Sequence, residues 1–310
     1  MRAAVLHQHG ATPRFGEFDD PTAGQGQVVI EVAAAALHHL DLHKATGTFY
    51  TGPPPLPSVV GTDGVGRLAD GRRVYFDVTV PPYGSMAERA LVPPDALLDL
   101  PEDIDYAVAA ALGNTGLGAW LALSWRSGLQ PGETVLVLGA TGAVGTIAVQ
   151  AARLLGAGRV VAAARASERL SRLPADATVA VDEAGDLTAA IKEAAGGAVD
   201  VTIDTLWGEP ALAAMKAASR HARHVQVGQI AGTDITLSAP AVRSVSLDVR
   251  GFSVAHPPPD VKRAAHRRLL EHTQRGDIVV DLERVPLEQI ERAWERQGMA
   301  AGGRKLVLIP

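Results

Sequence analysis

The feature that most constrains this chain is a glycine turn between an apolar strand and an apolar helix. Residues 139–145 read Gly-Ala-Thr-Gly-Ala-Val-Gly; they follow the apolar run 134–138 and precede the alanine-rich stretch 146–155. Glycines at such a junction allow a pyrophosphate to approach the backbone and the helix to pack closely on the strand. The helix start also offers free N–H groups and a positive dipole end. The turn therefore predicts a phosphate cradle, which we expect to be lined by Thr141, Gly142, Ala143 and Val144.

The glycine turn gains specificity from the pattern around it, because glycine makes up 32 of the 310 residues and chance spacings must occur. Buried strands are predicted at 160–164, 199–204 and 224–227, with alanine-rich helices at 187–195 and 209–219 between them. Strands that alternate with helices are typical of a parallel, doubly wound sheet. The sequence thus predicts an α/β protein.

Composition narrows the possible partners. The net charge is −5 and no run of Lys or Arg forms a basic patch, which argues against nucleic acid and favours a small molecule. The chain has no cysteine, which excludes disulfides and thiolate-bound zinc and makes the cytoplasm the expected compartment. No segment reaches the roughly 18 consecutive apolar residues of a membrane span, so no membrane partner is expected.

Changes in residue composition along the chain predict two domains. Residues 1–115 contain short valine-rich strands punctuated by Pro and Gly, which indicates an irregular β domain. A proline run at 257–259 marks a boundary, and a terminal strand follows at 304–309. We predict that residues 116–255 form a nucleotide-binding domain inserted into a substrate domain made of 1–115 and 256–310.

Four segments, in a fixed order along the chain, resemble the zinc-independent quinone oxidoreductase branch of the medium-chain dehydrogenase/reductase superfamily. They are residues 57–66, 83–92, 109–118 and 139–145. The resemblance implies a Rossmann doubly wound parallel sheet inserted into a GroES-like β-barrel catalytic domain. It also implies a homodimer formed through an edge of the nucleotide sheet, for which residues 238–250 are the expected segment.

The resemblance also implies metal-free chemistry. The zinc alcohol dehydrogenases of this superfamily hold their metal with two Cys and one His, and those positions here correspond to His38, Thr62 and Ala111. A catalytic zinc needs about three protein ligands, and His38 alone could serve. The quinone reductases usually carry Asn where this chain has His38. The imidazole adds a group that exchanges protons near neutral pH.

The second predicted strand of the sheet indicates the cofactor. NAD-preferring folds place Asp or Glu at its end, whereas this chain has Ala164 followed by Arg165, with Ser167 and Arg169 in the same turn. A cationic turn without a carboxylate favours NADPH. For Arg169 an ordinary solvated position in the next helix remains an alternative.

Further cofactor contacts are expected where strands end, since ligands of open α/β sheets bind at the carboxyl ends of the strands. The resemblance adds a helix beside the nicotinamide and a terminal basic residue that contacts phosphate. For this last residue, Lys305, a surface position on the strand is an equal alternative. The residues so assigned are Asn114, Thr115, Gly228, Gln229, Phe252, Val254 and Lys305.

Without zinc, hydrogen bonds must stabilise the oxyanion that forms on a carbonyl substrate. The candidates are His38, Tyr50 and Thr62, in segments that match the substrate cleft of the family. Asp41 could orient the imidazole, but capping of the following helix is the favoured role.

Three functions follow from these expectations. The leading hypothesis is an NADPH-dependent, zinc-independent reductase that transfers a hydride to a quinone or an α,β-unsaturated carbonyl. The first alternative is a zinc-free alcohol or ketone oxidoreductase that uses His38 for proton transfer. The second is a non-catalytic NADPH-binding regulatory protein.

Overall fold

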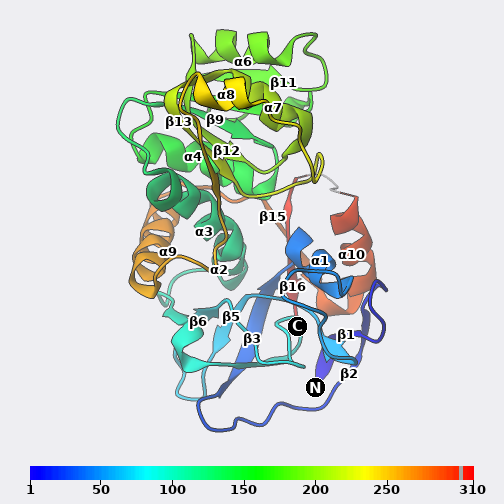
Figure 1. The fold of residues 1–310 in the computed structure, drawn as a ribbon. Helices are drawn as coiled ribbons and strands as arrows, with labels where there is room; N and C mark the ends of the chain where they lie inside the picture. Colours follow the sequence, from blue (N-terminus) through cyan, green and yellow to red (C-terminus); the bar gives the residue numbers. More distant parts are fainter. Residues whose placement is uncertain (300–302) are drawn as a thin grey trace. The chain divides into compact units, whose positions relative to one another are not determined.

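The structure, a computed structural model, describes residues 1–299 and 303–310 in two compact units. The first unit comprises Met1–Asn114 and Val280–Pro310, and the second comprises Thr115–Val279. Figure 1 shows the chain entering the second unit from α2 and α3 and returning through β15. Each unit is described by itself.

The two crossing points differ in how they compare with the predicted domain boundaries. The first lies one residue from the predicted one, whereas the return comes at Val280 rather than at 256. The helix α9 (Pro259–Gln274) therefore belongs to the second unit. Its His272 ring lies 5.4 Å from the ring of Trp120, and this packing keeps the helix with the nucleotide-type fold although the proline run precedes it.

The second unit follows the predicted alternation of strands and helices. Its elements, besides α9, are α3 (Asn114–Leu121), which starts at the last residue of the first unit, the π-helix η2 (Ala122–Ser127), β9 (Thr134–Leu138), α4 (Ala143–Leu154), β10 (Arg159–Ala164), α5 (Glu168–Ser171), β11 (Ala177–Ala180), α6 (Leu187–Ala195), β12 (Val199–Asp204), α7 (Gly208–Lys216), β13 (Ala218–Gln226), α8 (Ala239–Arg243) and β14 (Asp248–Gly251).

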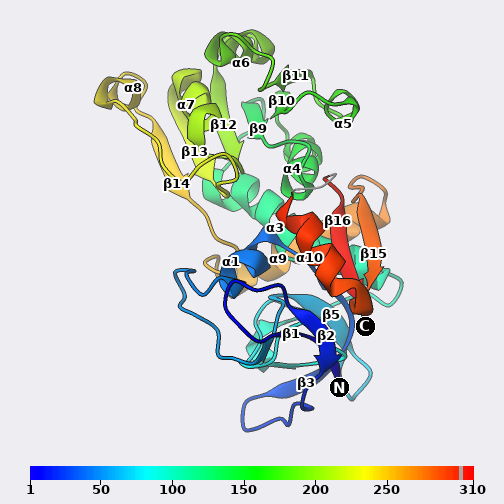
Figure 2. The ribbon, with the colours of Figure 1, turned by 90° about the vertical axis from the view of Figure 1, so that its right-hand side faces the viewer.

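The strands of this unit form one parallel sheet in the order β11-β10-β9-β12-β13-β14. Its central strands are continuous apolar runs because helices cover both faces. Helices α6 and α7 pack on the face that carries Leu136 and Leu138, while α4 and η2 contact each other and pack on the opposite face (Figure 2). The glycine turn lies directly after β9, in the middle of the sheet, where the strand order reverses. The expected Rossmann-type fold is confirmed.

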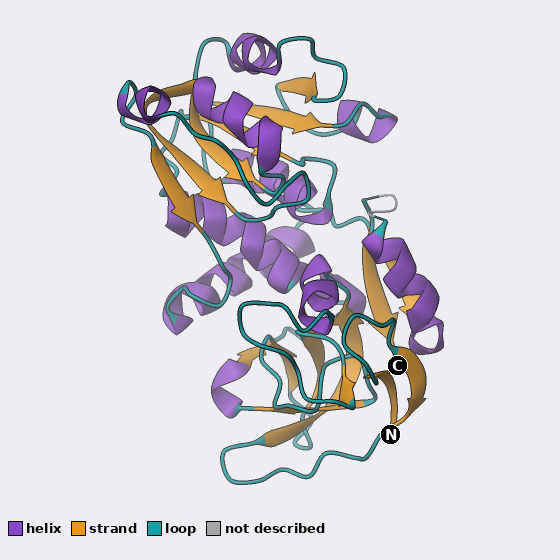
Figure 3. Ribbon diagram, turned by 45° about the vertical axis from the view of Figure 1, so that its right-hand side comes forward, coloured by secondary structure: helices purple, strands orange, loops and turns teal. Residues whose placement is uncertain are grey.

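The first unit consists mainly of antiparallel strands (Figure 3). Its elements are β1 (Arg2–Leu6), β2 (Arg14–Glu17), β3 (Val28–Ala36), α1 (His39–Ala45), β4 (Ser58–Val59), β5 (Gly64–Arg67), β6 (Arg73–Phe76), β7 (Arg89–Val92), η1 (Pro94–Ala96), β8 (Leu97–Asp99), α2 (Tyr106–Leu112), β15 (Leu282–Pro286), η3 (Leu287–Gln289), α10 (Ile290–Gly298) and β16 (Lys305–Ile309).

Two sheets, β2-β1-β4 and β15-β16-β3-β5-β6-β8, with β7 also paired to β3, organise the first unit. Its core contains Leu6, Ile30, Phe76, Trp294 and Leu308, which come from both chain segments. The last strand, β16, pairs with β3 in antiparallel fashion and with β15 in parallel fashion. This pairing places the start of β16 beside the end of β3, where the candidate site begins.

Among the described residues, no single helix is long and apolar enough to cross a membrane. Two neighbouring segments joined at a bend, Tyr106–Leu112 and Asn114–Ser127, are together long and apolar enough, judged by length and composition alone. Most of their side chains are buried within the protein.

Candidate functional site

The candidate site of the first unit begins where β3 ends and α1 starts. His38 is the N-cap of α1, with an extended backbone (φ −120°, ψ 157°), and its backbone N–H donates to Oδ2 of Asp41 at 2.8 Å. A carboxylate in the first helical turn that bonds the capping residue is a stabilising arrangement. Asp41 therefore serves the helix start, as the sequence predicts. The imidazole of His38 is thereby left to other partners.

Both ring nitrogens of His38 are hydrogen-bonded. Nε2 lies 2.6 Å from Oδ1 of Asp63, and Nδ1 lies 2.7 Å from Nζ of Lys305. A carboxylate can only accept, so Nε2 carries a hydrogen. The contact between Nδ1 and Nζ of Lys305 contains a single proton, because two N–H donors that face each other cannot form a hydrogen bond. Lys305 also donates to the backbone carbonyl of Leu37 at 2.8 Å.

Asp63 is fully buried and anchors the cluster. Its Oδ2 accepts from the hydroxyl of Tyr75 at 3.0 Å and from the backbone N–H of Asn114 at 2.9 Å. Burial by itself raises the pKa of Asp63, but the charge and hydrogen bond of His38, the charge of Lys305 and the Asn114 N–H together hold that pKa below its usual value. The carboxyl group thus remains ionised inside the protein.

Gly113 makes this arrangement sterically possible. A Cβ at this position would lie 2.2 Å from the Tyr75 ring and 2.7 Å from Oδ2 of Asp63. Only a glycine lets the end of α2 approach the buried carboxylate closely enough for the next residue, Asn114, to donate its N–H.

The burial of Lys305 contradicts the alternative of a surface lysine on the last strand. Its side chain is 4% exposed and is bonded to His38 and to the carbonyl of Leu37. The cause is the pairing of β16 with β3, which turns the first residue of β16 inward. Burial lowers the pKa of Lys305 to about 8, although the charges of Asp63 and Asp41 oppose this shift. Contact of Lys305 with a cofactor phosphate stays a prediction.

A second chain of hydrogen bonds passes through Thr62. Its hydroxyl donates to Oδ1 of Asp41 at 2.7 Å and accepts from Nζ of Lys44 at 3.0 Å. Thr62 and Asp41 are buried, whereas Lys44, in the last turn of α1, is partly exposed. The structure therefore brings two predicted residues, His38 and Thr62, into one network joined by Asp41.

Tyr50, the third predicted catalytic residue, lies apart from this network. It is 80% exposed in the loop that follows α1, and its ring packs against that of Phe49 with 4.0 Å between centroids. The Gly- and Pro-rich loop holds the side chain at the surface. Its proposed contact with substrate stays a prediction.

In the second unit, the glycine turn has the geometry of a phosphate cradle. Gly142 is the N-cap of α4, whose first turn is formed by Ala143 and Val144. A Cβ at Gly145 would lie 2.3 Å from the carbonyl oxygen of Gly139, too close for the helix to keep its present packing on the strand. A Cβ at Gly142 would lie 3.3 Å from the same oxygen. Bare backbone and free N–H groups at a helix start fit a pyrophosphate.

The turn after β10 contains the three residues expected to select the cofactor. Ser167 caps α5 and accepts the N–H of Leu170 at 3.2 Å. Arg169 donates from Nε to the carbonyl of Thr141 at 2.9 Å, which ties it to the glycine turn. Arg165 is exposed, and within the described chain its guanidinium has no hydrogen-bond or ion-pair partner. The structure thus leaves Arg165 available for a 2′-phosphate.

The remaining predicted cofactor contacts sit at the ends of strands in the second unit. Gly228 and Gln229 follow β13, and Phe252 and Val254 follow β14, at the carboxyl ends of parallel strands. Thr115 lies buried in α3. Their contacts with a cofactor stay predictions, as does the homodimer edge, which here includes the outermost strand β14.

Among residues 1–299 and 303–310, no group of three or more His, Cys, Asp or Glu side chains is placed to hold a metal ion. The predicted ligand positions explain this in chemical terms. Both nitrogens of His38 are hydrogen-bonded, and the hydroxyl of Thr62 is shared between Asp41 and Lys44.

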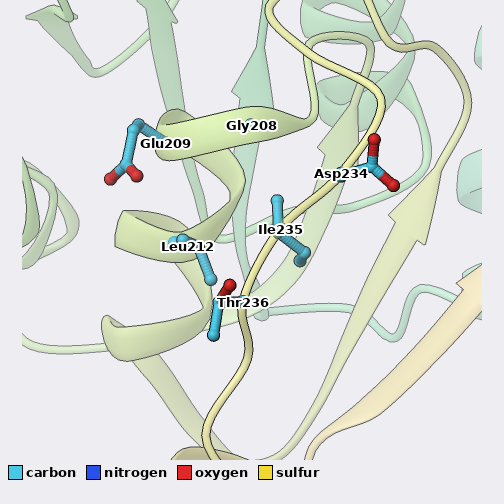
Figure 4. A pocket seen from close by; sticks show the side chains of 6 residues that line it. All are labelled: Gly208, Glu209, Leu212, Asp234, Ile235 and Thr236. Carbon is cyan, nitrogen blue, oxygen red and sulfur yellow. The ribbon is translucent and has the colours of Figure 1, made fainter.

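A recess of about 250 Å³ lies between the start of α7 and the segment after β13 (Figure 4). Its lining residues are Gly208, Glu209, Leu212, Asp234, Ile235 and Thr236. None of the predicted site residues lines it. In the close-up, the carboxylates of Glu209 and Asp234 lie at opposite ends of the recess.

Sequence reasoning missed three members of the cluster. Asp63 has a local signal, since it is a charged residue inside an otherwise glycine- and valine-rich segment. Tyr75 lies in a short strand, where the sequence does not show whether a tyrosine hydroxyl bonds a buried partner or the ring merely packs in the core. Lys44 has no signal at all, because its partner Thr62 is distant in sequence and the contact depends on the turn from β4 into β5.

The fold and the glycine turn together define a dinucleotide-binding α/β protein whose nucleotide unit is inserted into a β unit. Residues 143–271 match the family model described as zinc-binding dehydrogenase. Quinone oxidoreductase-like protein 2 of Bos taurus is 34% identical over 182 residues, which cover 58% of this chain and 51% of that protein.

Two further relatives extend the comparison. The 2-methylene-furan-3-one reductase of Solanum lycopersicum is 32% identical over 178 residues, covering 51% of this chain and 46% of that protein. The chain thus spans about half the length of these curated relatives. The quinone oxidoreductase of Thermus thermophilus, solved alone and with NADPH, is 30% identical with a TM-score of 0.86, covering 100% of both chains.

The chain belongs to the quinone oxidoreductase branch of the medium-chain dehydrogenase/reductase superfamily. The expected fold class, with a Rossmann-type sheet inserted into a β domain, is likewise confirmed.

Proposed function

We propose that this protein is an NADPH-dependent, metal-independent reductase that transfers a hydride to a quinone or an α,β-unsaturated carbonyl. The observation that carries the proposal is the hydrogen-bonded network around His38 and Thr62. His38 and Thr62 stand at two of the three positions where the zinc enzymes of the superfamily hold a metal, and here they form hydrogen bonds to Asp63, Lys305, Asp41 and Lys44 instead.

Metal independence is supported by the hydrogen bonds that already occupy the side chains of His38 and Thr62. A histidine ligand must offer an unprotonated nitrogen, yet Nε2 of His38 carries the hydrogen that Asp63 accepts. Its Nδ1 lies against the ammonium of Lys305, a cation that would repel a metal ion. The hydroxyl oxygen of Thr62 is a weak ligand and already accepts from Lys44.

Selection of NADPH is supported by the second unit. The glycine turn and the start of α4 would hold the pyrophosphate, and the exposed Arg165, next to Ala164, would hold the 2′-phosphate. When bound, the nicotinamide supplies the hydride. The Thermus thermophilus relative was solved with NADPH, which agrees with this assignment.

A carbonyl-type acceptor is supported by the cationic groups of the first unit. Hydride transfer to an enone or quinone leaves negative charge on oxygen, and fixed N–H donors stabilise such a charge. The names of the tomato and bovine relatives, a furanone reductase and a quinone oxidoreductase-like protein, belong to the same substrate class.

Direct protonation of a ketone by His38 is less well supported. That alternative requires a free ring N–H, whereas Nε2 serves the buried Asp63 and Nδ1 serves Lys305. A non-catalytic NADPH-binding protein would have the same cofactor residues, so only a measurement of turnover distinguishes it from a reductase.

The test is a steady-state assay of the purified protein with a panel of quinones and enones, using NADPH and NADH in parallel. Metal content is measured on the same sample, and each assay is repeated with a chelator. We expect oxidation of NADPH in preference to NADH, unaffected by the chelator. Tight NADPH binding without turnover on any acceptor would favour the regulatory role, and loss of turnover with the chelator would refute metal independence.

A further inference from the structure

We propose that Lys44 is a catalytic residue, whose ammonium group donates a hydrogen bond to the oxygen of the carbonyl or quinone substrate. The inference rests on the proposed function and assigns a residue that the family resemblance does not supply. Its basis is the chain of contacts from Asp41 through Thr62 to Lys44.

The position of the ammonium is fixed by two buried groups. Oδ1 of Asp41 accepts the hydroxyl hydrogen of Thr62 at 2.7 Å, and the lone pair of that hydroxyl accepts from Nζ of Lys44 at 3.0 Å. Asp41 is itself held by the N–H of His38 at 2.8 Å. A buried carboxylate thus polarises a hydroxyl, which in turn orients a cation at the edge of the cluster.

Comparison with the other donors of the network singles out Lys44. The hydroxyl of Thr62 has given its hydrogen to Asp41, and the nitrogens of His38 are both engaged. Lys305 is buried and donates to His38 and Leu37. Lys44 is partly exposed, and within the described chain Nζ makes a single hydrogen bond, which leaves two N–H groups for a ligand.

The ammonium of Lys44 acts on the oxygen that becomes negatively charged during hydride transfer. A hydride from the reduced nicotinamide forms a new C–H bond at the β-carbon of an enone, or at a ring position of a quinone. The π electrons move to the carbonyl oxygen, and the nicotinamide is oxidised. The resulting enolate oxygen is stabilised by the N–H of Lys44 and takes its proton. The enol then tautomerises by proton exchange with solvent, to the saturated ketone from an enone and to the hydroquinone from a quinone. Solvent returns a proton to the partly exposed amine of Lys44.

The first readout needs neither cofactor nor turnover. 4-Nitrophenol, whose phenolate absorbs differently from the phenol, is titrated with pH in the presence of the apoprotein. A nearby ammonium favours the phenolate, so the pKa of the bound probe should fall by about 1 unit or more. The shift should be kept in Lys44→Arg and lost in Lys44→Met and Lys44→Gln. Lys192→Met, which removes an exposed charge from α6 in the second unit, serves as the matched control.

The second readout is kinetic. Loss of one fixed donor to an oxyanion lowers kcat by about 10²-fold or more. Lys44→Met should therefore show such a loss of kcat with unchanged NADPH affinity. The kcat of Lys44→Arg should stay within about tenfold of the wild type, and that of Lys192→Met should be unchanged. Thermal unfolding of every variant verifies that it is folded. Should Lys44→Met fail to fold, Lys44→Gln provides the same comparison.

Failure of this inference is distinguishable from failure of the proposed function. Undiminished turnover and an unchanged probe pKa in Lys44→Met and Lys44→Gln would overturn the role of Lys44 and leave the reductase assignment standing. A Lys44-dependent shift of the probe in a protein that oxidises neither cofactor would support the oxyanion site and refute the reductase assignment.

Discussion

Nδ1 of His38 and Nζ of Lys305 lie 2.7 Å apart although 267 positions separate them in the sequence. Their contact exists because the last strand, β16, pairs with β3. The two groups share one proton next to the ionised Asp63. The site of the first unit is therefore a charge-balanced hydrogen-bond network built from both ends of the chain.

The buried ammonium predicts a specific pH dependence of stability. The pKa of Lys305 is about 8 in the folded protein, against 10.5 ordinarily. Between these values the unfolded chain binds a proton that the folded protein has released, so the contribution of Lys305 to the free energy of unfolding rises with pH. The slope is at most about 1.4 kcal/mol per pH unit.

Urea unfolding of the wild type and of Lys305→Met from pH 7 to 10 measures this contribution as a difference. We expect the wild type to gain stability relative to the variant above about pH 8. The range stops at pH 10 because burial raises the pKa of Tyr75 well above its ordinary value of 10. Above that pH the unfolded chain loses the Tyr75 proton while the folded protein keeps it, which would oppose the effect of Lys305. A difference that stays constant, or falls with pH, would contradict a buried lysine with a lowered pKa.

The hydroxyl of Tyr75 should contribute measurably to stability. Tyr75→Phe removes a donor to buried Asp63 and should lower the free energy of unfolding by about 1–3 kcal/mol. The chain offers a matched control, since the hydroxyl of Tyr106 is buried and has no hydrogen-bond partner among the residues that the structure describes. Tyr106→Phe should be neutral or stabilising. Equal effects of the two substitutions in chemical unfolding would argue against the Tyr75–Asp63 bond.

The two arginines after β10 should affect cofactor binding differently. Arg165→Ala should weaken NADPH binding about tenfold or more and leave NADH unchanged, because only NADPH carries the 2′-phosphate. Arg169→Ala should weaken both, since Arg169 supports the turn through the carbonyl of Thr141. Fluorescence titration with each cofactor makes the comparison. An equal loss of both cofactors in Arg165→Ala would remove that residue from the specificity site.

The glycines of the turn should separate folding from binding. Gly145→Ala places a Cβ 2.3 Å from backbone and should destabilise the protein strongly. Gly142→Ala meets its nearest atom at 3.3 Å, so the protein should fold while its cofactor affinity falls. Thermal unfolding and NADPH titration of both variants give the answer. Normal stability in Gly145→Ala would show that the helix does not need this close approach.

The nucleotide unit was predictable from sequence because its signals are local. The run 134–138, the glycine turn and the alternating helices each carry a period or a spacing that a short window contains. The return point was predicted too early, at 256. The proline run there resembles a boundary, and the packing of His272 on Trp120 is not visible in the spacing.

The site of the first unit was predictable only in part. His38 and Thr62 were expected from the family resemblance and lie in one network, and Asp41 caps its helix. The partners Asp63, Lys44 and Lys305 could not be assigned, because their contacts depend on how distant strands pair. The inward direction of Lys305 is set by β16 beside β3, a register that the last strand alone does not specify.

Hydride transfer from NADPH to an enone or quinone can be followed with an isotope. The purified protein is given NADPH deuterated at the reactive C4 position together with an α,β-unsaturated ketone, and the product is analysed by mass spectrometry. We expect one deuterium at the β-carbon of the saturated ketone. Recovery of the ketone unchanged, with NADPH unoxidised over the same panel of acceptors, would contradict it.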